Sequence, residues 1–366
     1  MLLLYFSIFL PLSISLAIGM YVIPRILLVS ARRQLFDEPD DRKVHERPVS
    51  RLGGISFLPI LLISTCTTMA LRMIFDTGFM GFGELERILL VRMVLLLLGM
   101  MVMYLVGVKD DVVGVAYRWK FVAQIFAGLL LPVGGVWIHG LDGLFGIHEL
   151  PVWAGWLLTV VVVVYITNAI NLIDGIDGLA SGLAMIAFVF FGLCFAWKGE
   201  YLMTSLSFGM TGVLIPFWGR NVFGNERRGR KIFMGDTGSL TLGYLLSFLV
   251  ICLSMQGGTM FPEGMLMVCI GTLVIPLLDV AYVVYVRVKN GKNPFKPDKN
   301  HIHHRLLRTG MGPHGVLVVL LVATLLFMAL NVAGVWAGMS LTLLLCTDVA
   351  LWLLMQLVIH LNRKST

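Results

Sequence analysis

The chain has 366 residues, of which 58% are hydrophobic and only 13% are charged. Soluble globular proteins are about 45–50% apolar and about 25% charged, so this composition excludes that class and predicts an integral membrane protein. The net charge of +7 does not indicate nucleic-acid binding, because the basic residues gather in loops on one side of the predicted membrane spans.

Eleven apolar segments follow one another along the chain, each close to the ~20 residues that a helix needs to cross a bilayer. Only helices suit such segments, because every backbone polar group must be paired within lipid. The first lacks a basic start and a small-residue cleavage site, so we expect a retained span. The predicted spans are 2–28, 54–74, 88–108, 119–138, 152–170, 179–197, 201–219, 239–256, 264–286, 315–335 and 339–360. The expected fold class is all-α, a polytopic integral membrane protein with a single transmembrane domain over residues 1–366.

Two further features of the spans predict their geometry and orientation. Prolines inside spans, such as Pro11, Pro59 and Pro276, predict kinks. Most of the 28 lysines and arginines fall in alternate loops and in the C-terminal tail. The positive-inside rule makes that side cytoplasmic, which puts the N-terminus outside and the C-terminus inside.

Acidic side chains that topology does not explain lie on the same side, at the ends of spans. The stretch "GVKDDVVG" (107–114) puts Asp110 and Asp111 at the inner end of the third span. The stretch "NAINLIDGIDGLA" (168–180) puts Asp174 and Asp177 just after the fifth span, and "KIFMGDTGSL" (231–240) puts Asp236 before the eighth. A fourth loop, "NPFKPDKNHIHHRL" (293–306), adds a cluster of histidines.

These acids predict a metal and phosphate site. Asp110 and Asp111 would point about 100° apart on a helix and so serve different tasks, whereas Asp174 and Asp177 can share one face. Clustered carboxylates beside lipid are costly unless a cation neutralises them, and oxygen donors without sulfur favour Mg²⁺ or Mn²⁺. Basic residues in the same loops fit a phosphorylated substrate. No lysine or arginine is near Asp174 and Asp177 in the sequence, so their positive partner is predicted to be absent from the chain.

Each motif also has an ordinary structural explanation. Asp110 and Asp111 could form a solvated helix end, and the two Asp-Gly pairs are common turn sequences. The Gly-Asp-Thr-Gly stretch around Asp236 could be a turn with a helix cap, and the histidines a surface loop. The coincidence of all four motifs on one membrane face favours a functional site.

Taken together, "GVKDDVVG", "NAINLIDGIDGLASG", "IFMGDTGSL" and "PFKPDKNHIHHRL" resemble the polyprenyl-phosphate N-acetylhexosamine-1-phosphate transferases, glycosyltransferase family 4. The stretch "DEPDDRKVHERPVSRLGG" (37–54) resembles the family's first cytoplasmic loop. The resemblance covers the core motifs at 37–310 and leaves a two-helix extension at about 315–360. The "HIHH" form and the eleven spans are more similar to the undecaprenyl-phosphate GlcNAc-1-phosphate transferase branch than to the muramoyl-pentapeptide branch.

The resemblance implies transfer of an N-acetylhexosamine 1-phosphate, GlcNAc 1-phosphate first among the candidates, from a UDP-sugar to undecaprenyl phosphate. UMP is the other product, and the reaction would begin synthesis of a cell-surface glycan. Implied partners are the UDP-N-acetylhexosamine, undecaprenyl phosphate, membrane lipids and a second copy of the chain, with no nucleic acid. The implied location is the bacterial inner membrane, with the active site facing the cytoplasm.

The resemblance also assigns roles to residues. Asp110, Asp111 and Asp236 are implied as catalytic residues that bind Mg²⁺, with His303 as a further catalytic residue. The implied substrate-binding residues are Asn171, Asp174, Asp177, Phe233, His304, Arg305, Lys43, Lys120 and Asn221. Asp279, inside the ninth span, is expected to support the site, because buried acids in spans are usually functional or paired. Asp348 in the last span belongs to no motif.

Three alternatives stay open. The first is the muramoyl-pentapeptide phosphotransferase of peptidoglycan synthesis. The second is a secondary transporter, which would hold its coupling acids near the middle of the membrane in broken helices. The third is a non-catalytic membrane scaffold, which would have no need of acids at helix ends.

Overall fold

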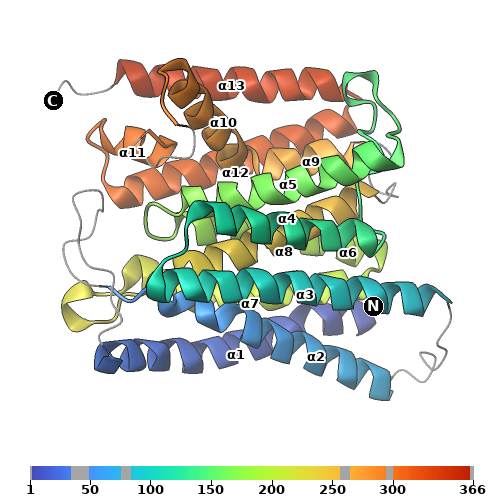
Figure 1. Ribbon diagram of the computed structural model, residues 1–366, viewed down its shortest axis with the longest axis vertical. Coiled ribbons are helices and arrows are strands. Elements are labelled where there is room, and N and C mark those ends of the chain that lie inside the picture. The colour runs from blue at the N-terminus through green and yellow to red at the C-terminus, as the bar shows by residue number, and fades with distance from the viewer. Residues whose placement is uncertain (1, 34–48, 76–83, 256–263, 294–299, 363–366) are drawn as a thin grey trace.

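The long helices of the protein lie side by side in a stack, as the computed structural model shows (Figure 1). The structure describes residues 2–33, 49–75, 84–255, 264–293 and 300–362. In the first half of the chain the α-helices are α1 (Leu2–Arg33), α2 (Phe57–Phe75), α3 (Glu84–Val113), α4 (Tyr117–Val133), α5 (Val152–Ile173) and α6 (Leu179–Lys198). In the second half they are α7 (Tyr201–Phe223), α8 (Gly235–Met255), α9 (Met265–Thr272), α10 (Val274–Lys289), α11 (Ile302–Leu307), α12 (Pro313–Trp336) and α13 (Leu341–Leu361).

The all-α membrane fold class is confirmed, but the number of spans is not. Among the described residues, nine helices are long and apolar enough to cross a membrane, or ten if α9 and α10 form one bent span. The predicted span 119–138 is only partly helical: α4 has 17 residues. That is ~26 Å at 1.5 Å per residue, less than the ~30 Å of a bilayer core.

The predicted span 264–286 is bent rather than straight. Helices α9 and α10 meet at an angle of 73°, and Leu273 between them has non-helical backbone angles. Pro276 has no N–H to donate to the carbonyl of Thr272, so the helical hydrogen-bond ladder is interrupted beside the bend. The kink predicted from Pro276 is therefore confirmed, whereas α1 continues as one helix from Leu2 to Arg33 through Pro11.

Helix α8 lies inside the stack and organises its neighbours. Almost all of its residues are buried, and α3 and α5 pack along it. A Cβ atom on Gly107 of α3 would come within 2.3 Å of the Thr237 backbone, so only glycine allows this close approach. The last turn of α3 is thereby held against the first turn of α8.

A short backbone ladder fixes the segment that leads into α8. The Phe233 N–H donates to the Ser50 carbonyl over 2.7 Å, and the Gly53 N–H donates to the Phe233 carbonyl over 3.0 Å. The Gly54 N–H donates to the Met234 carbonyl over 2.9 Å. The segment before α2 thus holds the backbone around Phe233 at one end of the helix stack.

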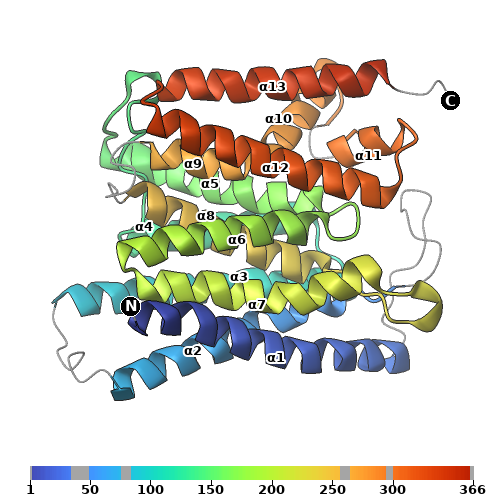
Figure 2. The ribbon, with the colours of Figure 1, turned by 180° about the vertical axis from the view of Figure 1, so that it is seen from behind.

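Helix α1 begins and helix α13 finishes at opposite ends of the stack, as the front and back views both show (Figures 1 and 2). The connections α3–α4, α5–α6 and α7–α8, the end of α10 and the start of α11 gather at the end where α13 finishes. All four polar motifs of the sequence belong to these connections or to the helix ends beside them. The motifs therefore meet at one end of the bundle.

Candidate functional site

Three carboxylates from two helices form the centre of the site. Asp110 and Asp111 lie in the last turn of α3, and Asp236 lies in the first turn of α8. Each offers a carboxylate oxygen, and these oxygens are all within 4.8 Å of one another. The acids lie at the ends of their helices and not at mid-span, which disagrees with the arrangement expected of a secondary transporter.

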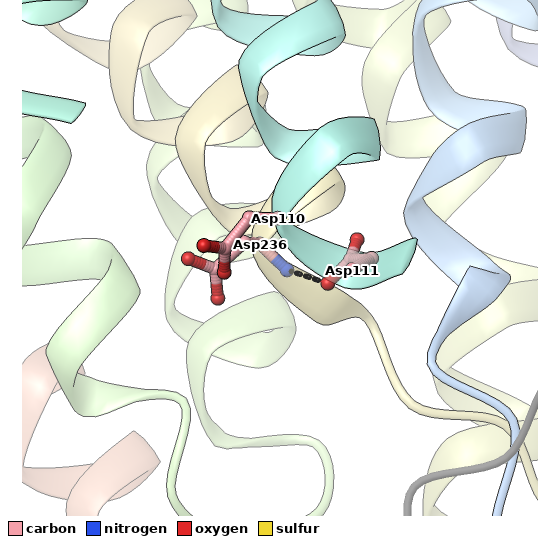
Figure 3. Close-up of side chains that lie close together, drawn as sticks. All are labelled: Asp110, Asp111 and Asp236. Carbon is pink, nitrogen blue, oxygen red and sulfur yellow. Dashed lines mark hydrogen bonds between the residues drawn. The ribbon is translucent and has the colours of Figure 1, made fainter. Parts of the chain in front are cut away.

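Asp111 is turned away from the other two acids (Figure 3). Its Oδ1 accepts the Asp236 N–H over 2.8 Å, and its Oδ2 accepts the Thr237 N–H over 2.9 Å and the Thr237 hydroxyl over 2.6 Å. Helix N-termini leave their first N–H groups without partners in the helix, and a carboxylate there satisfies them. Asp111 therefore caps α8 from a neighbouring helix and fixes the position of Asp236.

Asp110 and Asp236 face each other across the amino group of Lys120. The Lys120 Nζ is 2.8 Å from Asp110 Oδ2 and also contacts Asp236 Oδ2. Asp110 Oδ1 accepts the Val115 N–H over 2.7 Å. The amino group shows that this space favours positive charge, and the donors around it are oxygens without sulfur, which suits Mg²⁺. The residues present therefore fit the predicted metal, with Asp110 and Asp236 better able to serve as ligands than Asp111, whose oxygens already accept three hydrogen bonds.

A cavity of about 330 Å³ opens beside these acids. Ligand-binding pockets usually enclose about 300–1,000 Å³, so the cavity is large enough for a small molecule. Its wall contains many of the residues predicted from sequence, contributed by α3, α5, α7, α8, α11 and the loops between helices: Asp111, Asn171, Asp174, Asp177, Asn221, Phe233, Asp236 and His304.

Two amide side chains hold the cavity wall together. Asn221 is 5% exposed; its Oδ1 accepts the Gly178 N–H over 2.5 Å and its Nδ2 donates to the Ile232 carbonyl over 2.8 Å. It thereby ties the loop after α5 to the segment before α8. Asn171 Nδ2 donates to the Ser239 hydroxyl over 2.8 Å and links α5 to α8.

The prediction that Asp177 has no positive partner in the chain is wrong. Lys231 Nζ lies 2.7 Å from Asp177 Oδ2 and 2.6 Å from Glu226 Oε1, and 5.9 Å from the centre of the Phe233 ring. Lys231 is not predicted from the sequence, because topology is enough to explain the basic residues of this loop, and Glu226 belongs to no motif. Lys231 lies directly before the Ile-Phe-Met-Gly-Asp motif, which is the signal that could have identified it.

Asp174 and Asp177 differ in their electrostatic surroundings. Burial, reinforced by the nearby carboxylates of Asp177, Asp236 and Asp111, raises the pKa of Asp174 to about 8. Burial also raises the pKa of Asp177, although Lys231 opposes this shift. Desolvation lowers the pKa of Lys231, but its two carboxylate partners outweigh that effect and raise it overall. Asp174 thus carries a proton near neutral pH until a cation approaches it.

The histidine motif is held by Asp279, as expected of that buried acid. Asp279 Oδ2 lies 2.7 Å from His301 Nδ1, and its Oδ1 accepts the Ile302 N–H over 2.7 Å. His303 is buried against the α5–α6 loop, where a Cβ atom on Gly175 would be 2.0 Å from its Nε2. Burial, together with the neighbouring His304 and His301, lowers the pKa of His303 well below its ordinary value, so its ring is neutral at pH 7.

Not every predicted residue lines this cavity. Arg305 contacts Gln356 and lies over the Tyr282 ring, 4.7 Å from its centre, and it is not among the residues of the cavity wall. Lys43 lies outside the described residues, as do parts of the motifs at 37–54 and 293–306. Lys120, predicted as a phosphate contact, lies between two acids beside the cavity.

Comparison with known proteins relates this arrangement to one family. The family profile described as "Glycosyl transferase family 4" matches residues 93–254 of the chain. That range contains Asp110, Asp111, Asp174, Asp177 and Asp236, so it includes the acids at the centre of the site and in the cavity wall.

Several curated bacterial proteins are similar over most of the chain. An undecaprenyl-phosphate alpha-N-acetylglucosaminyl 1-phosphate transferase of Haemophilus influenzae is 31% identical over 76% of this chain and 73% of its own length. The protein of the same name from Yersinia pestis is 28% identical over 84% of this chain and 78% of its own. A probable undecaprenyl-phosphate N-acetylglucosaminyl 1-phosphate transferase of Bacillus subtilis is 28% identical over 91% of this chain and 87% of its own.

Proposed function

Because the chain belongs to glycosyl transferase family 4, we propose that it transfers N-acetylglucosamine 1-phosphate from UDP-GlcNAc to undecaprenyl phosphate. The products are undecaprenyl-diphospho-GlcNAc and UMP, and the reaction starts the synthesis of a cell-surface glycan. The curated relatives from three bacteria carry names that describe this transfer, which supports the assignment.

The observation that carries the proposal is the convergence of Asp110, Asp236 and Lys120 beside a cavity at the end of an apolar helix bundle. A lipid substrate keeps its chain in the membrane and brings only its phosphate to this end. One phosphate oxygen forms a bond to the β-phosphorus of the nucleotide sugar, while the bond from that phosphorus to the UMP oxygen breaks. Both reactants are anions, so catalysis requires neutralisation and in-line positioning more than covalent chemistry.

Asp236 and Asp110 are the residues that we propose hold Mg²⁺. When bound, the ion supplies positive charge that neutralises phosphate oxygens and orients them. Lys120, which lies between the two acids, would offer its amino group to an oxygen of the lipid phosphate. Asp111 keeps the first turn of α8 in place, which holds Asp236 at a fixed position.

The remaining cavity residues bind the nucleotide sugar in this proposal. Phe233 offers a ring for stacking on uracil, and the Asp177–Lys231 pair offers both an acceptor and a donor beside it. Asn171 and His304 offer polar groups to the pyrophosphate and sugar. His303 is neutral and acts as a hydrogen-bonding group, not as a cation.

Full-length protein in lipid nanodiscs, supplied with undecaprenyl phosphate, Mg²⁺ and UDP-GlcNAc, tests the assignment by release of UMP. Asp236→Asn and Asp110→Asn each remove charge from the reacting centre and are expected to lower kcat by ~10²-fold or more, the size found for single electrostatic groups. Chelation of divalent ions is expected to abolish turnover, and added Mg²⁺ is expected to restore it.

The matched control is Asp348→Asn, which neutralises another buried acid whose partner is Asn331 in α12. It should keep turnover near the unsubstituted rate. Full activity in Asp236→Asn would show that Asp236 does not bind a catalytic metal. Undiminished turnover with chelator would show that the reaction needs no divalent ion. A parallel assay with UDP-MurNAc-pentapeptide and other UDP-amino-sugars identifies the sugar donor.

The location follows from the same proposal. The site faces the cytoplasm of a bacterium, where nucleotide sugars are made, with the chain in the inner membrane. The N-terminus is then outside and the C-terminus inside, in agreement with the basic loops. A homodimer stays a prediction from the family resemblance.

A further inference from the structure

A second cavity, of about 150 Å³, lies between α10, α11 and α13. Basic side chains of Arg305, Arg308 and His360 line it together with Tyr282 and Ile359. None of the described lining residues is acidic, and none of them lines the cavity beside Asp236. Pockets that enclose a whole drug-sized ligand have about 300–1,000 Å³, so this one suits a small anionic group rather than a nucleotide sugar.

Arg305 is arranged to bind an anion. Its described contacts are with neutral groups: it donates to Gln356 Oε1 and, over 3.5 Å, to the Gln356 carbonyl, and it stacks on Tyr282. A guanidinium has five N–H donors, and the hydrogen bonds of Arg305 within the described part of the chain use only two of its three nitrogens. Gln356 is 5% exposed, and its Nε2 has no acceptor among the described residues. The planar fork of arginine matches phosphate geometry better than an ammonium group does.

The surroundings of the cavity identify the kind of anion. It lies where α10 and α13 finish, at the end of the stack where α8 begins. Beside it, apolar side chains point outward, with Tyr285 60%, Leu357 52% and Leu361 73% exposed. Such faces contact acyl chains in a bilayer, and the cavity then lies at headgroup level. Basic pockets between membrane helices bind anionic lipid headgroups.

We propose that this cavity binds the phosphate of an anionic membrane phospholipid, with the acyl chains lying along the exposed faces of α10 and α13. The bound headgroup would join α11 to the last helix through Arg305 and Arg308. Because α11 also carries His303, which packs against Gly175 of the α5–α6 loop, an occupied cavity fixes the histidine motif beside the first site. Lipid binding is independent of the transfer reaction and is measured without it.

Native mass spectrometry of the full-length protein in detergent tests this site. The protein is titrated with phosphatidylglycerol, with phosphatidylcholine of the same chain length, and with inorganic phosphate. Phosphatidylglycerol is expected to bind most tightly. Arg305→Gln and Arg308→Gln should each weaken its binding about tenfold, because a hydrogen bond to a charged group contributes about 1.5 kcal/mol. Arg305→Lys keeps the positive charge but loses the planar fork of donors. Its affinity for phosphatidylglycerol should lie between that of Arg305→Gln and that of the unsubstituted protein.

The matched control is Arg25→Gln, because Arg25 is an exposed arginine that also stacks on a tyrosine, with its guanidinium 3.6 Å from the Tyr21 ring centre. Its phosphatidylglycerol binding should equal that of the unsubstituted protein. Three results would overturn the proposal: unchanged binding in both the Arg305 and Arg308 variants, equal binding of phosphatidylcholine, or displacement of the lipid by inorganic phosphate at equal concentration. The last result would indicate a site for free anions.

Discussion

Asp110 and Asp111 are adjacent in the chain but contact different parts of the site. Asp110 faces Lys120 and the space next to Asp236, whereas Asp111 binds the backbone at the start of α8 (Figure 3). The difference arises because successive residues on a helix point about 100° apart. A charged residue beside a reacting centre and a residue that caps a helix should respond differently to substitution.

Asp111→Ala should therefore reduce stability as well as activity. It removes the acceptor of two backbone N–H groups at the start of α8, and loss of an N-cap costs about 1–2 kcal/mol. Thermal unfolding of the purified protein in detergent measures the change. Asp110→Asn is the control, which should keep the unfolding midpoint while losing turnover. Equal midpoints for Asp111→Ala and the unsubstituted protein would rule out the capping role.

Ionisation of Asp174 should make the free energy of unfolding depend on pH. Its pKa is about 8 in the folded protein and ~3.9 in an unfolded chain. The folded state binds this proton more tightly than the unfolded state does. Protonation of Asp174 therefore stabilises the folded protein fully below pH ~4, and this stabilisation is lost as the pH rises through ~8.

In metal-free protein, Asp174→Asn should flatten the decline in unfolding temperature between pH ~5 and pH ~8, because the amide does not ionise. Glu149→Gln, at an exposed position in the loop between α4 and α5, serves as the control and should leave the decline unchanged. Parallel curves for Asp174→Asn and the unsubstituted protein would show that Asp174 does not titrate in this range.

At the level of elements, the short helix α11 depends on α10 for its position. Asp279 of α10 binds both the His301 ring and the Ile302 N–H, and it is 1% exposed. The bend between α9 and α10 sets the direction of α10 and therefore the position of this acid. The histidine motif is thus positioned by a carboxylate from inside the helix bundle.

Asp279→Asn should lower kcat about tenfold, because the amide offers His301 a weaker partner and loss of a hydrogen bond costs about 1.5 kcal/mol. UMP release at saturating substrates measures this effect, and KM for undecaprenyl phosphate should change little. Asp348→Asn, which replaces a buried acid of α13, is again the control and should leave kcat unchanged. An unchanged kcat in Asp279→Asn would show that the hydrogen bond from Asp279 to the histidine motif is not needed for turnover.

For the whole molecule, the chain ends and the polar loops predict one orientation in the membrane. Phe223, at the end of α7 near the candidate site, is 70% exposed, and Trp336, at the end of α12, is 73% exposed. Helix α7 ends and α12 begins at the site end, so these two side chains mark opposite ends of the bundle.

Cysteine labelling tests the orientation. In a variant in which serine replaces the five native cysteines, Phe223→Cys should react with a membrane-impermeant maleimide only in inside-out vesicles. Trp336→Cys should react only in right-side-out vesicles. The two substitutions act as controls for each other. The reverse pattern would put the candidate site outside the cell and exclude cytoplasmic nucleotide sugars as its substrates.

Several properties were determined by the sequence alone. Long apolar segments predict membrane helices because unpaired backbone groups are not tolerated in lipid. Acids at the ends of these segments can be recognised because each is a charged residue next to an apolar sequence. The motif acids and the family resemblance could be identified on this basis. The kink near Pro276 could be predicted as well, since a missing N–H acts locally.

Which groups contact one another depends on how the helices pack. Lys231 pairs with Asp177, Lys120 lies between Asp110 and Asp236, and Asp111 caps a helix that begins more than a hundred residues later in the chain. Arg305, one residue after His304, faces a different cavity. Sequence spacing fixes neighbours within one helix, but contacts between helices depend on how their surfaces pack, and no local pattern encodes that packing.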